Sequence, residues 1–307
     1  MSSVLYDAPG PKARARSRVI SVVGILLVAG VLLWLILAMG APKPSANGAV
    51  QPGLWDPTRW DVFTDVQVWR SLGQGVLATL SMAGVAAVFA LIIGVLFSFG
   101  RSADHKAIRI PTTIILEFVR GLPVLLMMLF ILLVFATGAY WAGVAALAIY
   151  NGAIIGEALR AGIQSLPRGQ REAGLAIGLT PLATRFRIEF PQAFRQMLPI
   201  IIAQLVVLLK DTSLAFIVGY SELLRVGVKN LPDFFGNRYA FSFFLVVLAI
   251  YLAMNLSLSW FARFIARRSG PKSGKLVEPE PTLTPKDTLS STRGSYSTGD
   301  AGGPGTF

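Results

Sequence analysis

Three polar residues, Lys210, Asp211 and Ser213, lie deep inside an apolar run that is long enough to cross a membrane. Charged groups at such a depth cost on the order of 2.5–3.5 kcal/mol each, so they should face protein or water. A zwitterionic solute needs one cationic and one anionic partner, and Lys210 with Asp211 offers both. The alternative is that these charges only pair with neighbouring helices and stabilise assembly. The sequence leaves both roles open.

Two further charged pairs, Glu117 with Arg120 and Glu157 with Arg160, are each spaced three residues apart in predicted helices. Residues at this spacing share a helix face, where a local ion pair lowers the cost of removing charge from water. We therefore expect both pairs to be structural. Asn255, in the last apolar run, could bridge two helices through a hydrogen bond.

A long polar break, residues 165–191, separates two apolar runs and has a helical pattern of its own. Ser165 and Pro167 suit the start of a helix that continues to Ile177. Gly178 can adopt the positive φ that ends a helix. The first half of the break therefore predicts a short helix and a glycine corner.

The second half of the break predicts another short helix. Thr180 can cap a helix that begins at Pro181, and Pro191 is expected to end it. Three apolar residues follow one another at spacings of four and would share one face: Leu182, Phe186 and Phe190. Such an arrangement is compact enough to be a rigid contact surface.

The composition places the chain in a bilayer. Hydrophobic residues make up 54% and charged residues 14%, which is too apolar for an ordinary soluble domain. There is no cysteine and only one histidine, so no thiolate or histidine-built metal site is expected. The net charge of +12 does not indicate a nucleic-acid partner, because the basic residues flank apolar runs and form no recognition patch.

The pattern of apolar runs predicts an all-α, polytopic membrane helix bundle. The six predicted transmembrane helices are residues 19–39, 72–99, 111–136, 140–159, 197–219 and 239–264. Pro123 should kink or restart the third of them. The chain then divides into the tail 1–18, an extra anchor 19–40, an external loop 41–70, a core 71–265 and a disordered tail 266–307. A cleaved signal peptide competes for the first run, which exceeds the usual ~7–15 residue signal core.

The distribution of basic residues orients these spans. The proposed inside segments hold eighteen Lys and Arg residues and the proposed outside segments hold six. Basic residues concentrate on the cytoplasmic side of membrane proteins. We therefore expect a multi-pass protein of the bacterial cell membrane, inner or plasma, with both termini in the cytoplasm.

The polar break resembles the cytoplasmic coupling loop of permease subunits of ABC importers. That family has Glu-Ala-Ala, then Gly three residues on, then Ile-x-Leu-Pro after nine more residues. The matching positions here are Glu172, Ala173, Gly174, Gly178, Ile188, Phe190 and Pro191. The departures are Gly174 in place of Ala and Phe190 in place of Leu. The resemblance implies a type I ABC importer permease-like fold with an extra N-terminal helix.

A wider resemblance, over most of residues 70–265, is to permeases for polar amino acids. Phe118 to Pro123 is similar to their Phe-Arg-Gly-Thr-Pro signature, with Leu122 in place of Thr and one residue inserted before Arg120. Other segments look like the same subfamily: Tyr150-Asn151, Glu157, Arg160, residues 162–165, Gly169-Gln170 and residues 210–214. The added first span and the polar tail resemble actinobacterial glutamate permease subunits.

The resemblance implies that the chain is a transport subunit and not an enzyme. A dimer of ATP-binding subunits would contact the loop Glu172–Pro191 and the neighbouring Gln170. ATP and magnesium would be bound by those subunits, and this chain would carry no cofactor. A second permease chain, identical or homologous, an extracytoplasmic solute-binding protein and membrane lipid complete the implied partners. The segment Ser269–Leu276 lacks the first Gly and final Ser or Thr of a phosphate loop.

An ion-coupled secondary transporter or channel is the main alternative. It would explain the buried charges, but it predicts repeated halves with interrupted spans, and no such repeat is visible. An integral-membrane enzyme is the third class, and no metal-ligand or nucleophile constellation supports it.

Overall fold

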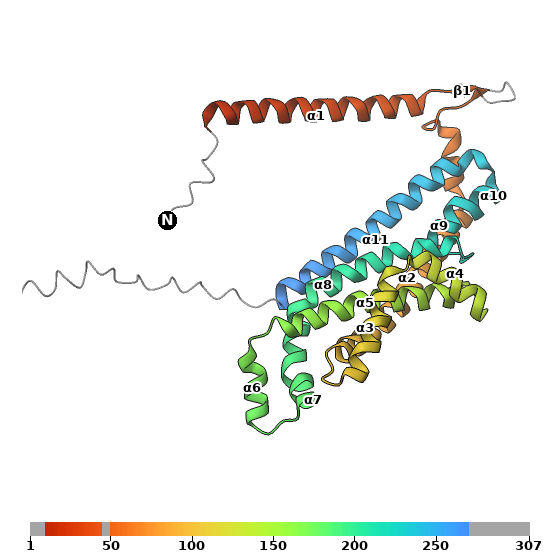
Figure 1. Ribbon diagram of the computed structural model, residues 1–307. Coiled ribbons are helices and arrows are strands. Elements are labelled where there is room, and N and C mark those ends of the chain that lie inside the picture. The colour runs from red at the N-terminus through yellow and green to blue at the C-terminus, as the bar shows by residue number, and fades with distance from the viewer. Residues whose placement is uncertain (1–9, 45–49, 270–307) are drawn as a thin grey trace, which may run out of the picture. The chain divides into compact units, whose positions relative to one another are not determined.

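The computed structural model describes residues 10–44 and 50–269, and within these ranges the chain is almost entirely helical. The long helices are α1 (Pro11–Gly40), α2 (Val66–Arg101), α5 (Ala139–Gln164), α8 (Phe190–Asp211) and α11 (Ala240–Ser269). The shorter helices are α3 (Lys106–Gly121), α4 (Val124–Phe135), α6 (Arg168–Ala176), α7 (Pro181–Thr184), α9 (Leu223–Arg225) and α10 (Leu231–Phe235). Figure 1 shows the order of these elements. The all-α prediction is confirmed.

Strand structure in the described residues is limited to a two-stranded antiparallel ribbon after α1. Its strands are β1 (Lys43–Pro44) and β2 (Val50–Gln51), and Lys43 pairs with Gln51. The ribbon lies in the segment expected as an external loop. Two 3₁₀ turns, Pro57–Arg59 and Asp61–Thr64, follow it and lead into α2.

Five helical stretches are long and apolar enough to cross a membrane, or six if one bent pair counts as a span. The bent pair is α3 with α4, which meet at 104° and together take the place of the third span expected from the sequence. Pro123 lacks a backbone N–H and forces Leu122 into an extended conformation, with ψ at 135°. The expectation that Pro123 restarts the helix is therefore confirmed.

Helices α2 and α5 run side by side in the same direction. A Cβ at Gly143 would meet Met82, one at Gly152 would meet Ile93, and one at Gly156 would meet Phe97. These contacts advance along both helices together. Because helices α2 and α5 run parallel, the segment between them must return to the starting side of the bundle, and α3 with α4 makes this return.

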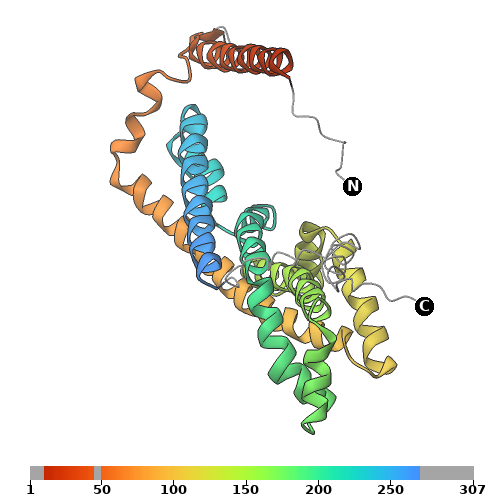
Figure 2. The ribbon, with the colours of Figure 1, turned by 90° about the vertical axis from the view of Figure 1, so that its left-hand side faces the viewer.

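Helix α8 runs antiparallel to α5, and α11 runs antiparallel to α8. Near its start, α8 places Met197 against Gly162 at the end of α5. Residues just beyond the far end of α8 lie near the start of α5, where Ala215 is close to Gly143. Figure 2 shows α8 and α11 from a second side. One buried core cluster is formed mainly by α2, α4, α5 and α8, and a second one joins the start of α2 to α9 and α11.

The observed helices differ from the expected segments at several ends. Helix α1 begins at Pro11, inside the segment expected as a polar tail, and no residue of its most apolar window is buried. The expectation that Pro191 ends the second helix of the polar break is wrong. The chain remains helical from Pro181 to Phe216, and the predicted fifth span, residues 197–219, is the later part of this long helix.

The reason is a wide, π-helical turn at Arg185–Glu189 directly before α8. The proline ring clashes with the preceding turn of a regular helix and cannot donate a hydrogen bond. A π turn changes the hydrogen-bond register at this point, so that Pro191 lies in the first turn of α8 where its missing N–H costs little. Helix α11 continues to Ser269, so the first residues of the tail expected at 266–307 are helical. The rest of that tail, with most of the phosphate-loop lookalike, lies outside the described residues.

Candidate functional site

The polar break forms two short helices joined at a glycine corner, as the sequence predicts. Helix α6 ends at Ala176, and Gly178 has a φ of +86°, which favours glycine. The N–H of Leu179 donates to the carbonyl of Gly174 at 3.1 Å, closing the end of α6. The hydroxyl of Thr180 then accepts from the N–H of Ala183 at 3.2 Å and caps α7.

Helix α6 packs closely against α7 and the π turn. A Cβ at Gly174 would lie 2.5 Å from Cγ2 of Thr184 and 2.9 Å from Cδ1 of Ile188. Gln170 adds a polar contact, because its Oε1 accepts from Nε2 of Gln192 at 3.2 Å. Close packing against Thr184 and Ile188 therefore explains why Gly174 stands where the family pattern has Ala. The two arms of the loop form one compact body (Figure 1).

The outer surface of this body is apolar where a soluble loop would be polar. Ile177 is 75% exposed and Leu182 is 66% exposed, and both flank the glycine corner. Glu172 and Ala173 are exposed on α6. Clustered exposed apolar residues mark an interaction surface. The loop therefore has an exposed apolar face around the glycine corner, next to positions of the sequence pattern that are not used internally.

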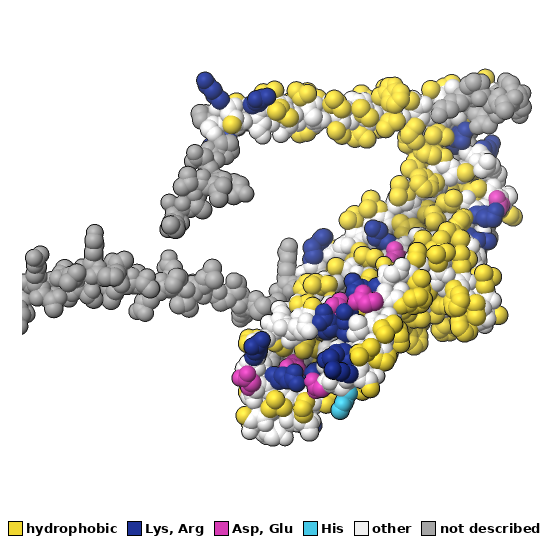
Figure 3. Space-filling model, in the orientation of Figure 1, with side chains coloured by type: hydrophobic (Ala, Val, Ile, Leu, Met, Phe, Trp, Pro, Cys, Tyr) yellow, Lys and Arg dark blue, Asp and Glu magenta, His cyan; other side chains and the backbone are white. Residues whose placement is uncertain are grey.

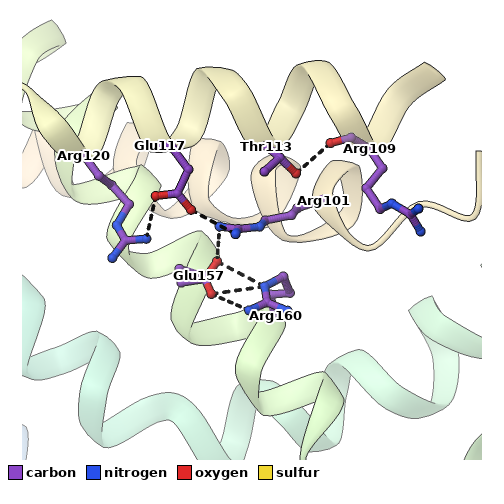
Figure 4. Close-up of polar contacts among 7 residues, drawn as sticks. All are labelled: Arg101, Arg109, Thr113, Glu117, Arg120, Glu157 and Arg160. Atoms are coloured by element: carbon purple, nitrogen blue, oxygen red, sulfur yellow. Dashed lines mark hydrogen bonds and ion pairs between the residues drawn. The ribbon is translucent and has the colours of Figure 1, made fainter. Parts of the chain in front are cut away.

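The two ion pairs predicted from sequence, Glu117–Arg120 and Glu157–Arg160, belong to a larger charge network, shown in Figure 4. Arg160 lies 2.5 Å from Glu157, and Arg120 lies 3.5 Å from Glu117. Arg101, at the end of α2, bridges both carboxylates at 2.9 Å and 2.7 Å. The network ties α2, α3 and α5 together at the end of the bundle that carries α6.

The sequence analysis did not name Arg101 as a site residue. The distance along the chain between Arg101 and Glu157 hides their contact, and no local spacing rule predicts it. The parallel course of α2 and α5, once known, places both residues at the same end.

Lys210 and Ser213 line a cavity of about 520 Å³ between α8 and α11. Asp211 does not line this cavity, although it follows Lys210 directly. Neighbouring residues on a helix point about 100° apart, whereas residues three apart share a face. Of the three predicted solute-path residues, the structure thus brings two together and separates the third.

Asn255, which the sequence analysis named as a possible bridge between two helices, lines the same cavity but forms no such bridge in the described residues. The Asn255 amide donates to the carbonyl of Tyr251 at 2.8 Å, within its own helix. Its Oδ1 is buried and has no hydrogen-bond partner in the described part of the chain. Both Asn255 and Lys210 line the cavity. Lys210 and the Asn255 side chain therefore border the same space, and the Asn255 oxygen itself is buried beside it.

A buried carboxylate, that of Glu222, is hydrogen-bonded to two residues that line this cavity, Leu224 and Tyr251. Glu222 is fully buried and accepts hydrogen bonds from the N–H groups of Leu224 and Arg225, both at 2.8 Å. The Tyr251 hydroxyl donates to the same carboxylate at 2.6 Å. Glu222 thereby caps α9 and links it to α11.

The comparisons with known proteins agree with this geometry. The family model described as "Binding-protein-dependent transport system inner membrane component" matches residues 88–270, which include the loop, the ion-pair network and the Lys210 cavity. The chain belongs to this family.

Two relatives of this permease, described as a glutamate and a probable glutamine permease, are matched over most of their own length. The glutamate transport system permease protein GluD of Corynebacterium glutamicum is 34% identical over 253 residues, covering 77% of this chain and 92% of the relative. The probable glutamine ABC transporter permease protein GlnP of Bacillus subtilis is 32% identical, covering 62% and 90%.

Solved structures have the same fold as this permease. The crystal structure of an amino acid ABC transporter with histidines is similar at a TM-score of 0.61 and 29% identity, covering 68% of this chain and 98% of the solved one. An inward-facing MetNI methionine ABC transporter has a TM-score of 0.57 at 20% identity, which shows the fold alone.

The permease is therefore the multi-pass inner-membrane component of an ABC importer of the polar amino acid family, and it has no ATPase activity of its own. A binding-protein-dependent ABC system implies an ATPase and a binding protein as its partners. The family assignment also decides against the ion-coupled transporter or channel considered above.

Proposed function

We propose that this permease conducts acidic amino acids, glutamate first among them, and that Lys210 is the residue that selects for them. The supporting observation is the charge inside the cavity between α8 and α11. Lys210 is the one charged side chain among the residues that line it, within the part of the chain that the structure describes. A lone cation in an otherwise apolar cavity favours a solute with a net negative charge.

The other polar groups fit the rest of an amino acid. The unpaired Oδ1 of Asn255 is an acceptor for an α-ammonium group, and the Ser213 hydroxyl is a neighbouring polar contact. The volume of about 520 Å³ lies within the usual range for small-molecule sites. Asp211 lies outside this cavity, so the anionic partner assigned to it from sequence is replaced by a neutral one. Asp211 is then a structural residue at the end of α8.

The loop formed by α6 and α7 is the contact for a separate ATPase. Helices α7 and α8 and the π turn form one continuous helical stretch that reaches Lys210. A displacement of the loop by the ATPase is then transmitted along this stretch to the cavity. ATP and magnesium are bound by the ATPase, and this chain supplies the contact residues around Gly178 and no cofactor site.

A second permease chain and a fixed orientation complete the proposal. With α1 as a further span, the chain crosses the membrane six times, since α3 with α4 must carry it back between α2 and α5. An even number of crossings puts both termini on one side, and the basic residues favour the cytoplasm. The exposed apolar face of α4, with Phe130 and Leu133, suits lipid or a second permease, identical or homologous.

Uptake by the assembled transporter tests the proposed selectivity. In Lys210→Met, we expect uptake of labelled glutamate to fall at least about tenfold, the size of one lost charge-assisted hydrogen bond, while the amount of protein in the membrane stays the same. Competition by unlabelled glutamine should become as effective as competition by glutamate.

Lys229→Met is the matched control, because Lys229 pairs with Asp233 at 3.3 Å and does not line the cavity. Unchanged preference for glutamate in a well-expressed Lys210→Met protein would refute the assignment. Equal loss of uptake and protein would favour a structural role for Lys210.

A further inference from the structure

A second cavity, of about 580 Å³ and lined mainly by polar residues, lies between the end of α2, the end of α5 and helix α6. Its charged lining residues are five arginines and three carboxylates, a net charge of +2: Arg101, Arg109, Arg168, Arg171, Arg185, Asp104, Glu172 and Glu189. Figure 3 shows charged side chains of both signs gathered at this end of the protein. The cavity is separate from the one lined by Lys210.

Arg185 is the least satisfied of these arginines. Its side chain is only 7% exposed, and its nearest carboxylate oxygens, on Asp104 and Glu189, are 3.7 Å and 3.8 Å away. These separations exceed hydrogen-bond length, and Nε of Arg185 has no partner in the described residues. The hydroxyl of Ser102, also buried, is unpaired as well. Buried donors without acceptors are uncommon and need an explanation, and an acceptor from outside the chain is one that fits a cavity lined by arginines.

A phosphate group has the chemistry that fits these donors. Guanidinium groups bind phosphate oxygens with two parallel N–H bonds, and the negative charge of a phosphate matches the excess of arginines. The carboxylates already present leave Arg185 and Ser102 unsatisfied. Arg109 and Arg168 have no ion pair within the part of the chain that the structure describes, so they are available to the same ligand.

The surroundings of the cavity favour a lipid as the source of the phosphate. Helix α3 begins beside it with Lys106 and Arg109 and exposes Ile114 and Phe118 along one face. A basic start and an apolar stripe are typical of a helix that lies in the membrane surface. Basic pockets at the cytoplasmic ends of transmembrane helices bind anionic headgroups.

We propose that this cavity binds the phosphate group of an anionic phospholipid, and that the bound headgroup fixes α6 to the end of α2. Arg171 on α6 already contacts Asp104 after α2 at 3.5 Å, and the headgroup adds a second link across the same gap. The proposal concerns a structural lipid and is independent of which amino acid is transported.

Native mass spectrometry of the full-length chain in detergent tests the proposal. We titrate it with phosphatidylglycerol, with phosphatidylcholine of the same acyl chains, and with inorganic phosphate. We expect one tightly retained phosphatidylglycerol, with retention lowered about threefold or more in Arg109→Gln and Arg171→Gln, because each loses charge-assisted hydrogen bonds to the phosphate. Both residues are exposed, so these variants should fold even if Arg185→Gln does not.

The control variant is Arg187→Gln, which removes the same charge from the same loop. Arg187 is exposed and does not line the cavity, so retention should be unchanged. Equal loss of lipid in Arg187→Gln would mean that the lipid is held by general electrostatic attraction to basic residues, and would contradict a specific site in this cavity. Equal retention of phosphatidylcholine, or preferential retention of inorganic phosphate, would overturn the anionic-lipid assignment. Release of the lipid when the ATPase binds would assign these arginines to the protein contact instead.

Discussion

Nη1 of Arg101, at the end of α2, lies 2.7 Å from Oε2 of Glu157 near the end of α5, and this contact shows that the two helices end on the same side. Both side chains are mostly buried, at 19% and 24% exposure. We expect Arg101→Met to lower the free energy of unfolding by about 1–3 kcal/mol, because the partly buried carboxylate of Glu157 and the exposed carboxylate of Glu117 both lose a partner. Thermal unfolding of the purified protein measures this loss. Arg70→Met, at an exposed position without an ion pair in the described residues, should change the unfolding temperature little.

Gly178→Asp should abolish ATP-driven uptake while the protein still inserts into the membrane. A Cβ at this position meets no atom within 4 Å, so no clash is involved. The strain comes from the positive φ, which costs most side chains roughly 1–2 kcal/mol. The added charge also falls at the corner of the exposed apolar face of the loop. Uptake and ATPase stimulation in reconstituted vesicles are the measurements.

Gly169→Asp is the matched control for this substitution. It adds the same charge to the same loop at a glycine with ordinary φ and open space around it, in the first turn of α6, where an acidic residue is favourable. We expect near-normal uptake. If Gly178→Asp transports normally at normal abundance, the corner is not part of the coupling contact.

Gly174→Ala should loosen the two-helix loop, although Ala is the residue that the family pattern has there. The new methyl would lie 2.5 Å from Cγ2 of Thr184, too close for van der Waals contact, so the two arms must separate. We expect a cost of about 1–3 kcal/mol and increased proteolysis within the loop. The double variant Gly174→Ala with Thr184→Ala removes the obstructing methyl and should restore protection. No rescue would mean that the close packing is not what holds the arms together.

Asn255→Leu should weaken transport without lowering stability. The native Oδ1 is buried and unpaired, so replacing the amide by a similarly sized apolar side chain removes an unsatisfied group from the chain. If that oxygen binds the ammonium group of the solute, the half-saturation concentration for uptake should rise about tenfold or more. Ser257→Ala, on the same helix but outside this cavity, is the control. Unchanged uptake kinetics would remove Asn255 from the solute path.

Local features of the fold could be predicted from the sequence because each depends on a few neighbouring residues. The corner at Gly178 follows from one glycine before a Thr-Pro pair, and the break at Pro123 follows from the missing N–H of proline. The pairs Glu117–Arg120 and Glu157–Arg160 follow from helical spacing. Each of these features depends only on residues close together in the sequence and needs no contact with another helix.

Features that depend on helix packing could not be predicted in this way. The role of Arg101 required the parallel course of α2 and α5. The unpaired state of Asn255 depends on which helix faces it. The continuation through Pro191 depends on a π turn that no single residue type specifies. The separation of Lys210 from Asp211 is different, since helical periodicity alone predicts that neighbours face different directions.

The glycines between α2 and α5 bring these helices into direct contact, since even a methyl group at Gly152 or Gly156 would overlap the opposite helix. Cavities lie instead along the seam between α8 and α11. When the permease changes shape, α2 and α5 should therefore behave as a fixed frame. The movement in each transport cycle would then occur between α8 and α11, where cavities that can open and close already exist.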